Sequence, residues 1–301
     1  MSNASFWRGV VPAITTPFKA DGTVDHAFLA NHARQLIAAG CTGIVPLGSL
    51  GEGATLSFDE KLEIVATLVE ALGDRAPVIP GIAALSTDEA VRLAQAAQRL
   101  GARGLMALPP YVYSTDWQEM GAHMRAILEA TDLPVLLYNN PVAYKTDFVP
   151  ERIAELAAAY PNLQAVKESS CDIRRFAAIK ALLGDRLELM VGMDDAIVEG
   201  VSMGAVGWIA GVVNAFPAES VRVFEQARDG GASAAMELYA WLLPLLRMDT
   251  VPKFVQLIKL MQQRVAMGDE RVRAPRLTVE GEERAQALAV IDHAIATRPK
   301  R

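Results

Sequence analysis

The sequence predicts an α/β fold, a (β/α)8 TIM barrel with a C-terminal three-helix appendage. Short apolar runs alternate with longer amphipathic segments from residue 10 to about residue 230, and this strand-and-helix pair repeats eight times. Such alternation implies a parallel sheet with right-handed crossovers, and eight repeats favour closure into a barrel over an open sheet. After about residue 230 the strand-like runs stop. We therefore expect a barrel over residues 1–230 and a helical extension over residues 231–301.

Eight apolar runs of strand length form the expected barrel, and each is followed by a segment of helical period. In chain order these runs cover residues 10–16, 42–47, 77–81, 104–108, 134–138, 163–168, 187–192 and 206–211. Three longer segments near the C-terminus have the helical period without strands between them. They predict the helices of the extension, over residues 232–246, 251–268 and 280–296.

Capping residues mark where several helices begin and end. In a capping box, a Ser or Thr side chain and a Glu or Gln three residues later satisfy each other's backbone amides. Three pairs match this pattern: Ser57 with Glu60, Ser86 with Glu89, and Thr115 with Gln118. The glycines that match left-handed helix ends are Gly40, Gly73, Gly101 and Gly184.

The composition excludes several classes of protein. The chain has 301 residues, of which 51% are hydrophobic, so it can bury a sizeable core. The formal net charge is −6 and the basic residues are scattered, which argues against a nucleic-acid partner. No stretch approaches the roughly 18 continuous apolar residues of a membrane span, and the N-terminus lacks the layout of a signal peptide. We therefore expect a cytoplasmic protein with no membrane partner.

The two cysteines, Cys41 and Cys171, are too few for a disulfide framework. We expect both to stay reduced in a cytosolic compartment. The sequence places no obvious base beside Cys171, so we assign it no chemical role.

Lys167 is the first residue that points to chemistry. In (β/α)8 barrels the active site lies at the C-terminal ends of the strands, and Lys167 stands at that end of the sixth expected strand. If its face of the strand points into the barrel, burial disfavours the ammonium form, and a neutral amine can attack a carbonyl carbon to form a Schiff base. In the alternative interpretation, Lys167 extends from the barrel rim to solvent or pairs with a carboxylate.

Tyr138 ends the neighbouring fifth strand and leads into the turn "NNP". A phenol at this position can move protons to and from a carbonyl oxygen during imine formation. Alternatively, Tyr138 is a packing residue of the barrel, and its hydroxyl caps that packing without taking part in chemistry.

The turn "GSLGEG" (48–53) follows the second expected strand and carries backbone amides with little side-chain bulk around them. Such a turn suits an anion, for example a carboxylate or a phosphate. Its spacing matches neither the dinucleotide fingerprint nor the phosphate loop, so it does not imply a nucleotide. A Gly-rich strand-to-helix turn without a ligand is the alternative.

Metal ligands are weakly indicated. The four histidines are dispersed and form no His-Glu-x-x-His pattern. Asp194 and Asp195 follow the seventh expected strand and offer carboxylates to a divalent ion, but we expect Asp194 to cap the next helix instead.

Several motifs in order resemble the dihydrodipicolinate synthase / N-acetylneuraminate lyase family of Schiff-base aldolases. The resemblance covers the barrel and extends to the C-terminal helices. The matching pieces are "TPF" (16–18), "GSLGE" (48–52), "PPY" (109–111), "YNNP" (138–141), "VKESS" (166–170) and "GAVGWIAGVVN" (204–214).

The resemblance implies a role for individual residues. Lys167 matches the lysine that forms the Schiff base with pyruvate or a related 2-oxo acid, and Tyr138 matches the general acid/base tyrosine. The turn with Gly48, Ser49 and Leu50 matches the substrate-carboxylate site, and the strand-eight backbone near Ile209 matches the segment that faces the bound keto acid. The resemblance also implies that no metal or organic cofactor is needed and that the protein is a homotetramer, a dimer of dimers.

Three departures from the family pattern lie on the side of the second substrate. Leu50 replaces a relay threonine, and Val112, between Tyr111 and Tyr113, stands where a relay tyrosine is donated across the subunit interface. Ala143 replaces an arginine that binds the second substrate's carboxylate. Tyr113 or Lys145 are the candidate substitutes for the lost groups.

The sequence therefore predicts a class I aldolase or lyase acting on a 2-oxo acid, different from the lysine-biosynthesis synthase, with a less polar second-substrate pocket. Cleavage of a carbon–carbon bond, dehydration and deamination all stay open, because relatives use the same lysine and tyrosine for each. Two other hypotheses about the function also stay open. One is a catalytically retired barrel that binds a small acid, and the other is a phosphate-handling barrel that uses the Gly-rich strand-eight region.

Overall fold

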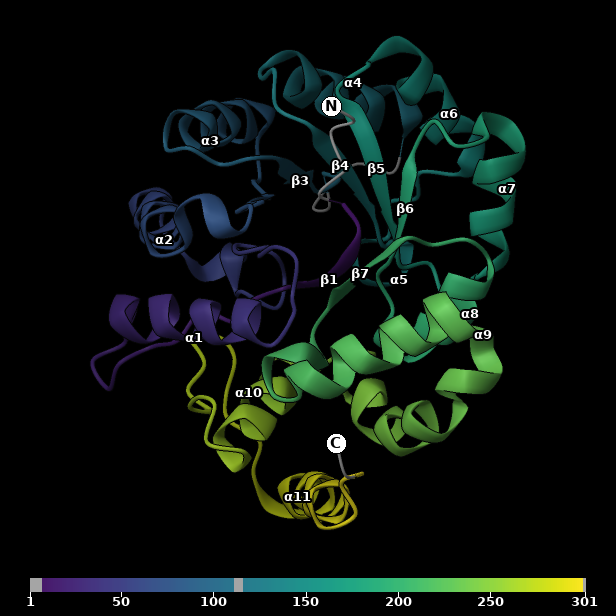
Figure 1. Ribbon diagram of the computed structural model, residues 1–301. Helices are drawn as coiled ribbons and strands as arrows, with labels where there is room; N and C mark the ends of the chain where they lie inside the picture. Colours follow the sequence, from purple (N-terminus) through teal and green to yellow (C-terminus); the bar gives the residue numbers. More distant parts are fainter. Residues whose placement is uncertain (1–6, 111–115, 300–301) are drawn as a thin grey trace.

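The computed structural model describes residues 7–110 and 116–299 and shows an α/β fold with a parallel sheet at its centre (Figure 1). The sheet has seven strands in the order β1-β7-β6-β5-β4-β3-β2. Strands β3 to β7 therefore follow each other both in the chain and in space, as right-handed strand–helix–strand units require. The strands are β1 (Gly9–Pro12), β2 (Gly81–Ile82), β3 (Leu105–Ala107), β4 (Val135–Asn139), β5 (Leu163–Glu168), β6 (Glu188–Val191) and β7 (Gly207–Ala210).

The second expected strand, 42–47, makes isolated parallel bridges rather than a strand of the sheet. Val45 bridges to Ala13 after β1, and Ile44 bridges to Val78 before β2. Backbone hydrogen bonds support both contacts: the amide of Val45 donates to Pro12 at 2.8 Å, and that of Ile44 donates to Pro77 at 3.0 Å. The segment thus lies between the two edge strands.

Prolines explain why two expected strands are shorter than the sequence pattern. A proline has no N–H to donate to a neighbouring strand, so it interrupts a ladder. Pro46 lies in the 42–47 segment, and Pro77 and Pro80 lie in the expected strand 77–81, which the structure reduces to β2 at residues 81–82. The other six expected strands are confirmed, and 163–168 has the predicted bounds.

The helices lie around the strands, with α10 and α11 away from the β3 to β5 side (Figure 1). The α-helices are α1 (His26–Ala38), α2 (Phe58–Leu72), α3 (Thr87–Arg99), α4 (Trp117–Glu129), α5 (Pro141–Tyr144), α6 (Pro150–Ala159), α7 (Arg174–Leu183), α8 (Ile197–Ser202), α9 (Pro217–Leu246), α10 (Phe254–Arg264) and α11 (Gly281–Ala296). Short 3-10 turns are η1 (Gly53–Thr55), η2 (Gly73–Arg75), η3 (Asp194–Ala196), η4 (Val212–Asn214) and η5 (Arg247–Asp249).

The helix ends match most of the capping predictions. Ser57 and Glu60 form the predicted capping box of α2, and Ser86 accepts the Glu89 amide at the start of α3. The prediction for α4 was wrong in its residue: Asp116 caps this helix, and Thr115 lies outside the described residues. All four predicted helix-end glycines have positive φ.

The first predicted helix of the extension, 232–246, is the second half of α9. Gly231 has φ 74° and ψ −179°, so the helical path breaks at this residue although α9 runs from Pro217 to Leu246. The predicted helices 251–268 and 280–296 correspond to α10 and α11. Across residues 7–110 and 116–299, none of the helices combines the length and the apolar character that crossing a bilayer demands.

Candidate active site

Lys167 and Tyr138 lie side by side at the C-terminal ends of β5 and β4. The strand register pairs the two residues directly, and both are buried, with 6% of each residue exposed. The Lys167 Nζ atom stands 4.1 Å from the centroid of the Tyr138 ring. The predicted juxtaposition of amine and phenol is thus present.

Lys167 is buried and makes no direct ion pair with a described residue. Its burial rules out extension into solvent. Among the described residues, no carboxylate lies within 4.0 Å of its Nζ atom. Two buried acids, Asp194 and Asp249, interact electrostatically with Lys167 from a greater distance.

Gly192, after β6, leaves space for the Lys167 side chain. A Cβ atom on Gly192 would lie 2.8 Å from Lys167 Cε and 1.9 Å from the Ser169 hydroxyl. The Ser169 hydroxyl is fully buried and has no hydrogen-bond partner in the described part of the chain. This corner beside Lys167 therefore holds an unsatisfied polar group.

Asn140 organises the segment after β4. Its Nδ2 atom donates to the Tyr138 hydroxyl at 3.0 Å, and its Oδ1 atom accepts the Ala143 amide at 3.0 Å as the N-cap of α5. Because Tyr138 oxygen accepts this bond, its own proton remains available for donation. Pro141 at the first helical position then starts the one-turn helix that carries Tyr144.

Tyr144 comes back toward the strand ends. Its ring lies edge-on to the Tyr138 ring, with centroids 5.8 Å apart and an interplanar angle of 89°. Its hydroxyl makes a short hydrogen bond with the Ser49 hydroxyl. The structure thus joins the "YNNP" turn and the "GSLGE" turn, which are about ninety residues apart in the chain.

The "GSLGE" turn has the properties of an anion-binding turn. The amides of Ser49 and Leu50 donate to no acceptor among the residues that the structure describes. Leu47, just before the turn, and Glu52, its last residue, have positive φ values of 65° and 54°. Left-handed backbone costs a non-glycine residue about 1 kcal/mol or more, so the surroundings must hold the turn in this shape.

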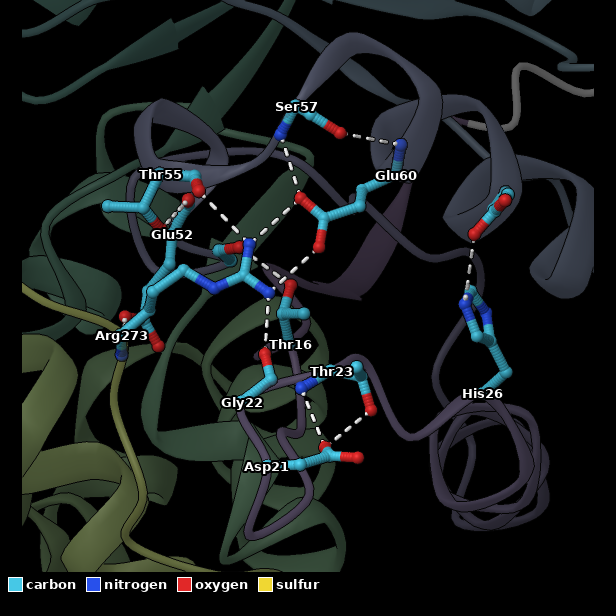
Figure 2. Close-up of polar contacts among 12 residues, drawn as sticks. Thr16, Asp21, Gly22, Thr23, His26, Glu52, Thr55, Ser57, Glu60 and Arg273 are labelled. Atoms are coloured by element: carbon cyan, nitrogen blue, oxygen red, sulfur yellow. Dashed lines mark hydrogen bonds and ion pairs between the residues drawn. The ribbon is translucent and has the colours of Figure 1, made fainter.

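Part of that support comes from the C-terminal region. Glu52 is 0% exposed, and its Oε1 atom accepts a hydrogen bond from Lys259 Nζ of α10 at 2.5 Å. Its Oε2 atom accepts the amide of Arg273 at 3.0 Å. Figure 2 shows the Arg273 guanidinium reaching on to Glu60, Thr55 and Gly22, with both of its terminal nitrogens 2.8 Å from a Glu60 oxygen. These contacts hold the pKa of Glu60 down, at about 2.

Asp194 does not cap a helix, so that prediction was wrong. Its side chain is fully buried and accepts the Trp208 indole N–H at 2.9 Å and the Val212 amide at 2.8 Å, as well as the Gly211 amide. These donors surround the end of β7. The carboxylate therefore accepts hydrogen bonds from N–H groups at the end of this strand and not from the first amides of the helix that follows Asp194. Burial raises the pKa of Asp194 to about 6, and burial also raises that of its neighbour Asp249 well above the ordinary range.

Within the described residues, no group of three or more metal-ligating side chains gathers at one place. Burial raises the pKa of Cys41 to about 12 and also raises that of Cys171, whose residue is exposed.

The comparison with known proteins adds a family to this geometry. Residues 6–294 match the dihydrodipicolinate synthetase family. The chain belongs to that family.

Named relatives cover the chain almost entirely. A 4-hydroxy-tetrahydrodipicolinate synthase of Agrobacterium fabrum is 32% identical over 289 residues, which is 96% of this chain and 98% of the relative. A putative dihydrodipicolinate synthetase from Pseudomonas aeruginosa has a similar structure, with 31% identity, a TM-score of 0.90 and coverage of 95% and 99% of the two chains.

A second similar structure is that of YagE, a prophage protein of the dihydrodipicolinic acid synthase family from E. coli K12, in complex with pyruvate. It is 25% identical, with a TM-score of 0.90 and coverage of 97% of this chain and 99% of that chain. Members of the dihydrodipicolinate synthetase family are class I aldolases and lyases that use a Schiff base. This chain is therefore an enzyme of that class.

The residues that depart from the family pattern differ in how exposed they are. Leu50 is buried, whereas Ala143 is exposed on α5. Lys145, one candidate substitute, is exposed and donates to the carbonyl of Val142 at 2.9 Å, so it does not reach the site. Tyr111, Val112 and Tyr113 lie outside the described residues. Ile209 is buried in β7 as expected.

Sequence reasoning missed Asn140 and Tyr144. A signal for both was present, since Asn before Pro is a common N-cap with proline at the first helical position. A short helix at 141–144 was therefore foreseeable. The contact between Tyr144 and Ser49 was not, because nothing local in either segment specifies it.

Proposed function

We propose that this enzyme forms a Schiff base between Lys167 and pyruvate or a related 2-oxo acid, with Tyr138 as general acid/base. The observation that carries the proposal is the in-register pairing of a buried amine and a buried phenol at adjacent strand ends. Amines with these surroundings are suited to attack on a carbonyl carbon.

The two side chains account for the protons of imine formation. The Lys167 nitrogen attacks the keto carbon, and the carbonyl electron pair moves to oxygen. One proton passes from the amine to that oxygen and a second comes from Tyr138, so that water leaves and a protonated imine remains. The protonated imine accepts the electron pair of the bond that breaks beta to it. When a bond forms, the imine first loses a proton from the carbon next to the imine carbon, and the resulting enamine supplies the electron pair.

The Gly48 to Gly51 turn fits the substrate's carboxylate. The amides of Ser49 and Leu50 have no acceptor among the described residues, and the Ser49 hydroxyl stands beside them. Backbone amides gathered in a turn bind anions without a counter-ion. In this arrangement Ile209 at the end of β7 faces the keto acid.

We further propose that the enzyme is not the lysine-biosynthesis synthase and that its second-substrate pocket is less polar. Leu50 offers no hydroxyl, Ala143 no guanidinium, and Lys145 is turned to the surface. Aldehydes with apolar side chains should then be accepted in preference to polyhydroxylated or dicarboxylic ones. Steady turnover of only the latter would contradict this. Dehydration or deamination through the same imine is the alternative chemistry.

Borohydride trapping tests the central proposal. The enzyme is incubated with pyruvate, reduced, digested and mapped by mass spectrometry. We expect a covalent adduct at Lys167 that a Lys167→Arg variant lacks. An unmodified Lys167 would favour a retired acid-binding barrel if pyruvate still binds. It would favour a phosphate-handling barrel if phosphate esters bind instead.

The scaffold proposal is a closed (β/α)8 barrel over residues 1–230 with a helical extension over 231–301, assembled as a homotetramer. The bridges of Ile44 and Val45 to both edge strands support closure, and the break at Gly231 supports the boundary. Light scattering of the purified protein tests the assembly, and a dimer or monomer would contradict it.

A further inference from the structure

We propose that Tyr144 of the same chain is the relay tyrosine of this site, exchanging protons with Tyr138 through the Ser49 hydroxyl and the reacting oxygen. The inference rests on the proposed function and adds a residue that the sequence motifs do not identify. The family resemblance implies a relay tyrosine at position 112, and this chain has Val112 there.

The contacts of Tyr144 carry the inference. Its hydroxyl and the Ser49 hydroxyl share a short hydrogen bond, and each of these groups can both donate and accept. Its ring lies against the Tyr138 ring at 5.8 Å between centroids. The acceptor bond from Asn140 turns the Tyr138 proton toward other partners. Two phenols and one hydroxyl therefore meet within one chain, beside Lys167.

The local chain path explains how Tyr144 reaches this position. Asn140 caps α5 with the same side chain that contacts Tyr138, so the helix start and the phenol are held together. Lys145 then ends the helix in the left-handed conformation, with φ 60°. One turn of helix thus brings residue 144 back over the strand end that carries residue 138.

Proton balance defines what Tyr144 does. When Tyr138 gives its proton to the departing oxygen, it becomes a phenolate and must be reprotonated before the next turnover. Tyr144 passes a proton along its hydrogen bond to Ser49, and Ser49 passes its own proton through the water released in imine formation to the Tyr138 phenolate. Solvent then reprotonates Tyr144, which is half-buried. In the reverse step each proton returns. In this path Tyr144 acts through Ser49, so it is a positioning and relay residue.

A purely structural role gives a different expectation. Tyr144 is only half-buried, and its ring packs on Tyr138. If packing were its whole contribution, phenylalanine would replace it without loss, whereas leucine would not. A relay needs the hydroxyl, so phenylalanine should fail as well.

The experiment compares Tyr144→Phe and Tyr144→Leu with Tyr160→Phe as the matched control. Tyr160 donates its hydroxyl to Glu129 at 2.6 Å on an exposed surface, away from the site. The rate of the borohydride-trappable adduct is measured by rapid quench, and pyruvate affinity is measured separately by titration.

We expect Tyr144→Phe to slow adduct formation about 10- to 100-fold, within the range for lost acid–base assistance, while pyruvate affinity changes little. Raising the buffer concentration at fixed pH should accelerate this variant but not the wild type, because a buffer acid replaces the missing proton donor. Tyr160→Phe should match the wild type.

Distinct outcomes separate the two proposals. If the wild type yields no adduct at Lys167, the proposed function and the relay both fail. If the wild type is trapped and Tyr144→Phe reacts within twofold of it, only the relay is overturned. Loss of rate in Tyr113→Phe with none in Tyr144→Phe would likewise overturn it and assign the relay to Tyr113.

Discussion

Replacing Lys259 with methionine should destabilise the protein and loosen the substrate-carboxylate turn. Lys259 and Glu52 are 1% and 0% exposed, and their 2.5 Å contact joins α10 to the left-handed residue after "GSLG". Removing one partner of a buried ion pair leaves the other charge buried and unpaired, which lowers the free energy of unfolding by about 3 to 5 kcal/mol. Glu52 keeps the Arg273 amide at 3.0 Å and Arg276 at 3.8 Å, so we expect the lower part of that range.

Urea denaturation measures this loss as a free energy of unfolding. The matched control is Arg264→Gln, which breaks the half-exposed pair of Arg264 with Asp292. Exposed pairs contribute about 0 to 1 kcal/mol, so the control should remain near the wild type. The double variant Glu52→Gln/Lys259→Met leaves no stranded charge and should recover much of the stability.

Function supplies a second readout of the same pair. Because Glu52 is the last residue of the "GSLGE" turn, the KM for pyruvate should rise in Lys259→Met more than kcat falls. The reasoning would be refuted if Lys259→Met cost no more stability than Arg264→Gln. It would also be refuted if the double variant were as unstable as the sum of its two single variants.

Three other substitutions test the site and its surroundings. Gly192→Ala places a methyl 2.8 Å from Lys167 Cε, so borohydride trapping should fall to background while circular dichroism shows a folded protein. Burial lowers the pKa of His32 to about 4, so the unfolded chain binds more protons between pH 6.5 and 4 and stability falls by about 3 kcal/mol over that range. His32→Gln should flatten the dependence of the melting temperature on pH, and an unchanged slope would assign it to other groups. Asn140→Ala removes an N-cap and the bond to Tyr138, so we expect a loss of about 1 kcal/mol in unfolding free energy. Its kcat should also fall, and an unaltered kcat would show that Tyr138 needs no help from this side chain.

The sequence by itself determined the period of the fold and the place of the chemistry. Alternation of apolar runs and helical segments predicted where the strands lie, and the C-terminal ends of parallel strands put Lys167 beside Tyr138 without knowledge of any contact. Local chemistry also predicted the Ser57 cap and the helix-end glycines, because these depend on residues within one turn.

Only the tertiary structure decided which distant groups meet. Three contacts join segments that no local rule connects. Ser49 bonds to Tyr144, Glu52 is buried against Lys259, and the Asp194 carboxylate accepts hydrogen bonds from the end of β7. Each depends on how the strands and the C-terminal helices pack. Packing sets which polar groups lose water, and a buried polar group takes the partner that the fold provides.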